Sequence, residues 1–129
     1  MLLPRIYTDS TGHSLLDEVD LKMTGPGGAE ARDGVYFQRI QAAQQEVSYW
    51  NIGHALPGHF VDFTPMAANT FIAVFSGKMH ITVSNGEERQ LTSGDMMLAQ
   101  DLTGQGHMTR FVGQDPCNYL MIAMPGGFK

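Results

Sequence analysis

Hydrophobic and polar residues alternate strictly over residues 78–83, where Met79, Ile81 and Val83 are separated by Lys78, His80 and Thr82. A period of two is typical of a strand with one buried face, so Met79, Ile81 and Val83 are expected to point into the protein interior. The dipeptide that follows, Asn85-Gly86, predicts a two-residue hairpin turn. This part of the chain is therefore predicted to be β-structure.

Similar short segments recur along the chain, separated by turn-forming residues. The predicted strands cover residues 35–40, 46–52, 59–63, 70–76, 87–91, 96–98, 107–112 and 118–124. Residues 15–21 also favour a strand, with a helical turn as the alternative. Many short strands at regular spacing predict an all-β sandwich or barrel in a single domain. We expect residues 46–124 to form the barrel and residues 1–45 to pack on it as N-terminal strands and a loop.

The segment 70–76 is apolar on both faces. If Thr70, Ile72, Val74 and Ser76 face the interior, then Phe71, Ala73 and Phe75 face outward. An apolar outer face has to be covered. The cover could be the N-terminal strands or a second copy of the chain; we favour a mixture of the two, and a homodimer over a monomer.

Composition narrows the functional classes. The chain has 129 residues and a formal charge of −5, with 8 Lys and Arg against 13 Asp and Glu. It has no basic run for a nucleic acid, and its one cysteine excludes an internal disulfide and a multi-cysteine zinc site. No apolar run reaches the roughly 18 residues of a membrane span, and the N-terminus lacks signal-peptide features. A cytoplasmic location is therefore expected.

Two motifs carry a family resemblance. The spacing Gly58, Thr64, Met66, Thr70 and Gly77 overlays the first cupin motif, which places His, His and Glu at the three middle positions. The second motif opens at Gly94 and closes with Gly104-Gln-Gly-His107, with a loop two residues longer and Leu102 at the usual proline position. The chain thus resembles a small single-domain cupin, which implies a jelly-roll barrel.

A group of small cupin-like proteins resembles the chain over most of its length. The shared segments are Arg5-Ile-Tyr-Thr-Asp9, Asp62-Phe63, and Asp101-Leu-Thr-Gly-Gln-Gly-His107. Cupins host many unrelated chemistries, so this resemblance implies the fold much more strongly than a function.

The resemblance implies a metal site of three histidines and one carboxylate, of which only His107 remains. One imidazole with threonines and a thioether is a poor donor set for a divalent ion. We therefore predict a barrel with no metal and no other cofactor. The alternative is a rearranged metal site drawn from His54, His59, Asp62 and His107.

His107 is the strongest candidate catalytic residue because histidine titrates nearest to neutral pH. Asp101, six residues earlier, could orient the imidazole as a second catalytic group. The alternatives are an inherited core histidine and an aspartate that caps its own turn.

A substrate cavity would be lined by residues that the cupin-like motif spacing and strand alternation place inside the barrel. Strand alternation from an inward Thr64 puts Asp62 and Phe60 inward and His59 outward. The candidate substrate-binding residues are Thr64, Thr70, Met66, Phe60, Ile72, Met79, Phe111 and Asp62. Such a set is typical of a small-molecule site, and equally of a filled core.

Three functions remain open. The first, which we favour, is metal-independent acid/base chemistry of isomerase, cyclase or lyase type on a small, largely apolar organic substrate. The second is a non-catalytic small-molecule binding or sensor protein. The third is a metal-dependent cupin oxygenase with a rearranged site.

Overall fold

The computed structural model describes residues 1–24 and 41–128, and these residues contain ten β-strands. They are β1 (Leu2–Thr8), β2 (Ser14–Asp20), β3 (Tyr49–Ala55), β4 (Phe60–Thr64), β5 (Thr70–Ser76), β6 (Lys78–Thr82), β7 (Glu88–Leu91), β8 (Met96–Gln100), β9 (His107–Val112) and β10 (Cys117–Ala123). No helix long and apolar enough to span a membrane occurs within these residues.

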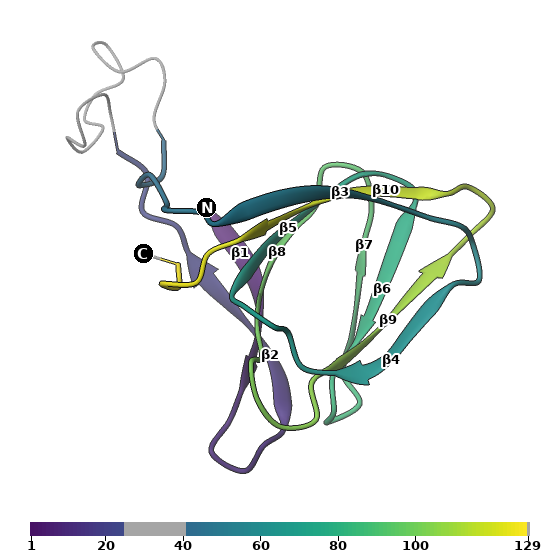
Figure 1. Ribbon diagram of the computed structural model, residues 1–129, viewed down its shortest axis with the longest axis horizontal. Helices are drawn as coiled ribbons and strands as arrows, with labels where there is room; N and C mark the ends of the chain where they lie inside the picture. Colours follow the sequence, from purple (N-terminus) through teal and green to yellow (C-terminus); the bar gives the residue numbers. More distant parts are fainter. Residues whose placement is uncertain (25–40, 129) are drawn as a thin grey trace.

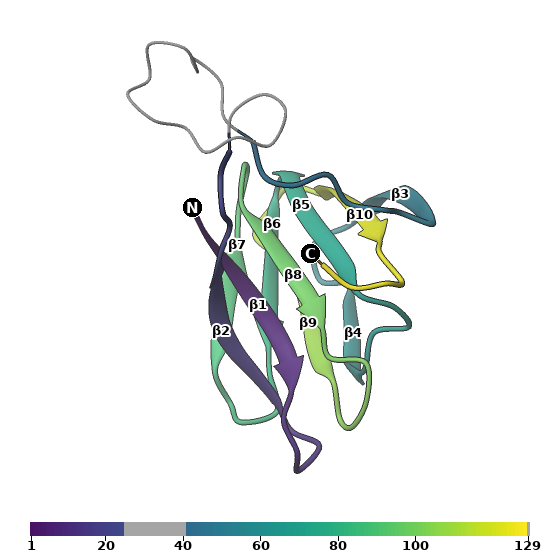
Figure 2. The same ribbon diagram turned by 90° about the vertical axis from the view of Figure 1, so that its left-hand side faces the viewer.

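The strands build two sheets that face each other across a common interior (Figure 1). One sheet has the order β2-β1-β8-β5-β10-β3 and the other the order β4-β9-β6-β7. Neighbouring strands are antiparallel except β1 and β8, which run parallel (Figure 2). The predicted all-β sandwich or barrel is confirmed.

The main hydrophobic core lies between the two sheets. Met79, Ile81 and Val83 are at most 2% exposed, so the inward face predicted from their alternation is confirmed. Ile72 and Val74 of β5 join them from the opposite sheet. Burial of side chains from both inner faces is what holds two stacked sheets together.

A second apolar cluster covers part of the outer face of the six-stranded sheet. It contains Leu3, Leu21, Leu98 and Met124, with Phe71 packed against it. Strands β1 and β2 extend this sheet beside β8 and do not lie over its outer face (Figure 2). The N-terminal residues Leu3 and Leu21 nevertheless belong to the cluster against which Phe71 packs, whereas Phe75 stays 54% exposed.

Three local features differ from the sequence prediction. β1 was not predicted, because Pro4 and its flanking residues lack a clear alternation. The Asn85-Gly86 turn is a three-residue loop, since the Val83 amide donates to the Glu87 carbonyl and Gly86 has a φ of +92°. The predicted strand 35–40 lies outside the described residues.

Gly106 holds the loop before β9 against β4. Its φ is +74°, and a Cβ at this position would lie 2.1 Å from the Thr64 carbonyl carbon. The Ser14 hydroxyl donates a 2.6 Å hydrogen bond to the Gly106 carbonyl oxygen. Only glycine fits both the backbone angle and the close approach.

Replacing Gly106 with alanine should therefore lower the free energy of unfolding by about 3–5 kcal/mol, because strain and a backbone clash add. Gly94→Ala is the matched control: its φ is +88° but no atom lies within 4 Å of the added Cβ. The control should lose only about 1–2 kcal/mol, the cost of the left-handed backbone alone. Chemical denaturation measures both, and equal losses would show that the close approach is unimportant.

Candidate functional site

His107 and Asp101 form a buried hydrogen-bonded pair. The His107 Nδ1 atom lies 2.6 Å from Asp101 Oδ2. Asp101 is 0% exposed and His107 is 5% exposed. A buried carboxylate is stable only when polar partners compensate its lost hydration, so the Nδ1–H group is expected to donate to Asp101. Of the two interpretations of Asp101, the structure has the one in which it contacts the imidazole. The catalytic roles of both residues stay a prediction.

The ends of two strands bring this pair together. Asp101 directly follows β8, and His107 is the first residue of β9. The loop between them is anchored at both ends, because the Met66 amide donates to the Asp101 carbonyl and the Gln105 amide donates to the Gly12 carbonyl. The loop therefore returns His107 to the carboxylate six residues before it.

Nδ1 is the only side-chain atom of His107 with a hydrogen bond among the described residues. Asp101 Oδ1 is buried and has no hydrogen-bond partner there. The ring nitrogen left for another molecule is Nε2, and the imidazole lines a cavity. An imidazole fixed at one nitrogen and free at the other can accept and return a proton at the free one.

The cavity lies between the two sheets and has a volume of about 160 Å³. Its apolar lining residues are Val61, Met66, Ile72, Met79, Phe111 and Met121, and its polar ones are Thr64, His107, Thr109 and Tyr119. Apolar walls with a few polar groups are characteristic of small-molecule sites. A mostly apolar wall also strengthens any electrostatic interaction that His107 makes.

Most of the predicted substrate-binding residues line this cavity. They lie on β5, β6 and β9, at the end of β4 or just after it, and they are Thr64, Met66, Ile72, Met79 and Phe111. Thr70 is buried beside them, but its hydroxyl donates to the Ala68 carbonyl oxygen at 2.8 Å. Whether any of them binds a substrate stays a prediction.

The predicted inward direction of Phe60 and Asp62 is wrong. Val61 pairs with Thr109 and Thr64 pairs with His107, so β4 has one residue more than β9 between these pairs. This bulge reverses the alternation, because an extra residue turns the following side chains to the opposite face. Val61 therefore lines the cavity, whereas Phe60 is 57% exposed and Asp62 is exposed as well.

Val61, Tyr119 and Met121 are lining residues that the sequence analysis missed. The signal for the last two was present, since residues 117, 119, 121 and 123 share one face of β10 by alternation. The Tyr119 ring also depends on Gly53, directly opposite on β3, because a Cβ there would lie 2.1 Å from the Tyr119 Cζ atom.

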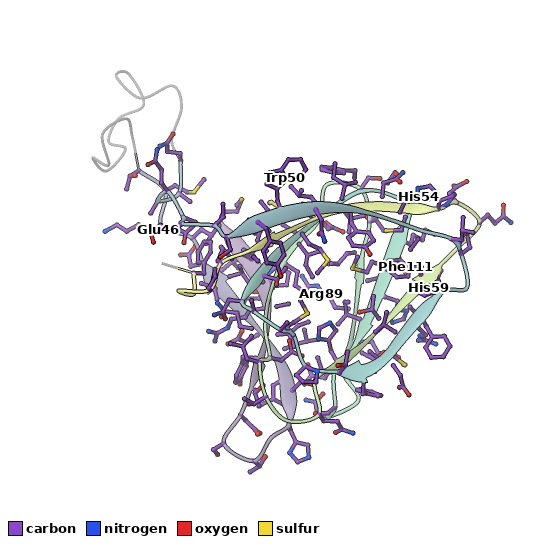
Figure 3. All side chains as sticks on the ribbon, viewed as in Figure 1. Glu46, Trp50, His54, His59, Arg89 and Phe111 are labelled. Carbon is purple, nitrogen blue, oxygen red and sulfur yellow. The ribbon has the colours of Figure 1, made fainter. Side chains whose placement is uncertain are left out.

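Three stacked rings lie near the β3–β4 connection, and two of them, Phe111 and Tyr119, line the cavity. His59 and Phe111 have centroids 5.9 Å apart, and Phe111 and Tyr119 have centroids 5.6 Å apart. Figure 3 shows Phe111 and His59 next to each other on that side. Burial raises the pKa of the Tyr119 hydroxyl, so this group stays protonated at neutral pH and can donate a hydrogen bond.

The residues of the site do not fit the metal centre implied by the cupin motifs. Thr64, Met66 and Thr70 occupy the motif positions, and only His107 provides an imidazole. The rearranged alternative fits no better: His54 binds the Asn118 side chain, His59 stacks on Phe111, and Asp62 accepts the Phe63 amide. The described residues contain no group of three His, Cys, Asp or Glu that could hold a metal.

Comparison with known proteins supports the fold. An uncharacterized conserved protein with a double-stranded beta-helix domain from Klebsiella pneumoniae is 26% identical, with a TM-score of 0.50 over 60% of this chain and 66% of its own. A conserved protein of unknown function from Streptococcus pyogenes is 14% identical, with a TM-score of 0.50 over 64% of this chain and 68% of its own. A cupin protein from Bacteroides fragilis is 24% identical, with a TM-score of 0.46 over 71% of this chain and 87% of its own.

No protein-family model matches the chain, and no curated protein matches it. The chain spans about two thirds of the length of the Klebsiella protein. Together with the observed topology, the likeness to the Klebsiella protein shows that the chain has a double-stranded β-helix fold.

The geometry predicts one tautomer for His107. ¹⁵N correlation spectra of the protein at neutral pH should show a proton on Nδ1 of His107 and none on Nε2. The reason is that an ionised Asp101 can only accept a hydrogen bond, so Nδ1 has to donate it. His59 is a control, since it is exposed and its ring stacks on Phe111. The Asp101→Asn variant should lose this preference, and a bare Nδ1 in the wild-type protein would contradict the assignment.

Proposed function

We propose that the chain binds a small, largely apolar organic molecule in the 160 Å³ cavity and carries out metal-independent acid/base chemistry on it. The observation that supports this proposal is the Asp101–His107 pair. A buried carboxylate holds one nitrogen of the imidazole at 2.6 Å, and the same imidazole borders an apolar cavity. A core histidine needs no such orientation toward open space.

His107 would act as the proton acceptor through Nε2. Asp101 would hold the ring in the correct tautomer and stabilise the imidazolium that forms when Nε2 takes a proton. The proton would then return from Nε2 to another atom of the same molecule, which results in isomerisation or cyclisation, or to a leaving hydroxyl, which results in dehydration. The proton that His107 takes up is returned within the same reaction, so no other reactant is required.

Other polar lining groups would position the substrate. Thr64 and Thr109 carry hydroxyls that can donate to a carbonyl oxygen, and Tyr119 offers a third donor. Donors aimed at a developing negative charge are most effective in a dry, low-dielectric site. The volume suits a molecule of about the size of benzene, which a protein cavity of roughly 150 Å³ can hold.

The scarcity of polar groups in the lining favours a second candidate. Six of the ten lining residues are apolar, and an apolar cavity alone suffices to bind a ligand without transforming it. The chain would then be a small-molecule carrier or sensor. In that case His107 would contribute one hydrogen bond to affinity and nothing to turnover.

Deuterium incorporation tests the acid/base proposal without knowledge of the product. Small apolar cyclic ketones are incubated with the protein in D₂O, and exchange of the protons next to the carbonyl is followed by NMR. The wild-type protein should accelerate exchange above buffer, since each proposed reaction begins with removal of such a proton. A loss of about 10²–10⁴-fold is expected in His107→Ala, the range of general acid/base catalysis.

His80→Gln is the matched control. His80 lies on the outer side of β6, paired with Glu88, and should leave exchange unchanged. Binding of the same ketones is measured in parallel by ligand-observed NMR. Binding with no exchange supports the carrier, and equal exchange in wild type and His107→Ala would overturn the proposed mechanism.

A further inference from the structure

Exposed apolar side chains are concentrated on one side of the molecule. Twelve large hydrophobic residues are exposed in the part of the chain that the structure describes, and seven of them lie between residues 49 and 63. We call these seven the β3–β4 patch: Tyr49, Trp50, Ile52, Leu56, Phe60, Val61 and Phe63. Trp50 and Ile52 are each 63% exposed, and Figure 3 shows Trp50 directed away from the interior.

The patch coincides with two sheet edges. β3 ends the six-stranded sheet and β4 ends the four-stranded sheet, on the same side of the sandwich (Figure 1). An edge strand presents unpaired backbone donors and acceptors that can bind another strand. Exposed apolar side chains and open edges therefore occur together on this side.

The two opposite edges are protected by charge, whereas these two are not. β2 carries Asp17, Glu18 and Asp20, and β7 carries Glu88 and Arg89. β3 has the sequence YWNIGHA with no Asp, Glu, Lys or Arg, and β4 has the sequence FVDFT with a single aspartate. Charged side chains on an edge prevent it from pairing with another chain. This difference in charge between the edges favours a β3–β4 side that is covered by another chain.

The exposed area suits a protein interface. The four aromatic side chains of the patch are 37–63% exposed, and a whole aromatic side chain offers about 150–250 Å². Trp50 lies on the outer side of β3 and Phe60 on the outer side of β4, so they flank the two edges from different sheets. A standard interface takes about 800 Å² from each partner, and the aliphatic side chains and edge backbone are still to be added.

We propose that a second copy of this chain covers the β3–β4 patch, with the two β3 strands antiparallel across a two-fold axis next to Ile52. A two-fold contact brings the same surface of both copies together, so any charge near the axis would meet its own like charge. The lack of formal charge in β3 is the condition that such a contact requires. If the two β3 strands overlap along their whole length, Trp50 lies opposite His54 of the partner subunit.

This dimer also reaches the neighbourhood of the cavity, although it does not depend on the proposed chemistry. Val61 belongs to both the patch and the cavity lining. Tyr49 and Asn51 border a smaller hollow of about 150 Å³ that shares Met66 and Met121 with the cavity. The second copy would therefore cover the side on which the cavity walls are most exposed.

Light scattering coupled to size-exclusion chromatography tests the proposal on the whole chain. The wild type should elute as a dimer at micromolar concentration, with about twice the 14.2 kDa mass of one chain. Ile52→Lys places two like charges at the axis and should weaken dimerisation by at least about 100-fold, as should Trp50→Glu. Phe75→Lys is the matched control, an exposed apolar residue on the outer face of the same sheet, and it should remain a dimer.

Circular dichroism and thermal unfolding of each variant establish that it is folded. Hydrogen–deuterium exchange of the wild type gives a second readout that needs no substitution: protection of the β3 amides should increase with protein concentration. A wild-type monomer would overturn the proposal, and so would a monomer with protected β3 amides, which would show that the same chain covers the edge. Dissociation by Phe75→Lys but not by Ile52→Lys would place the interface on the outer sheet face instead.

Discussion

The Asp101 carboxylate has no exposed surface, and the interactions of the surrounding loop partly compensate for its burial. An ionised carboxylate loses several kcal/mol of hydration on burial, which only hydrogen bonds or an opposite charge can compensate. His107 provides one such bond at 2.6 Å, and Oδ1 is left without a partner in the described residues. Gly106, Ser14 and the turn at Gly12 hold the loop in the position that this bond requires. Such an incompletely satisfied buried group is typical of a functional site and unfavourable as core packing.

The sequence was sufficient for the strands that turn-forming residues delimit on both sides. β5 and β9 have the predicted bounds, and Met79 and Ile81 of β6 face the interior as expected. The sequence also offered the contact between Asp101 and His107, as one of two interpretations of an aspartate six residues before the histidine. In each of these cases local pattern and tertiary packing agree, which is the condition under which a one-dimensional pattern is informative.

The failures arise where one extra residue changes the phase of a strand. A bulge between Val61 and Thr64 turns Phe60 and Asp62 to the outside, and no residue type in FVDFT marks that position. β1 joins the sheet by parallel pairing with β8, a contact between residues about ninety positions apart that leaves no local pattern. Tyr119 depends on Gly53, which lies opposite it on β3, and that cross-strand register is set by the fold.

The cavity has one rigid side and one open side. Met79, Ile72 and Phe111 belong to strands with two neighbours each and are at most 4% exposed, so the wall around His107 is fixed by packing. Val61 and Thr64 belong to β4, which has a neighbour on one side only, and both are exposed. Strands with few buried contacts open at lower free energy than the core. In a single copy, β4 is therefore the side that can move to admit a ligand without disturbing the Asp101–His107 bond, whereas the proposed dimer would cover this side.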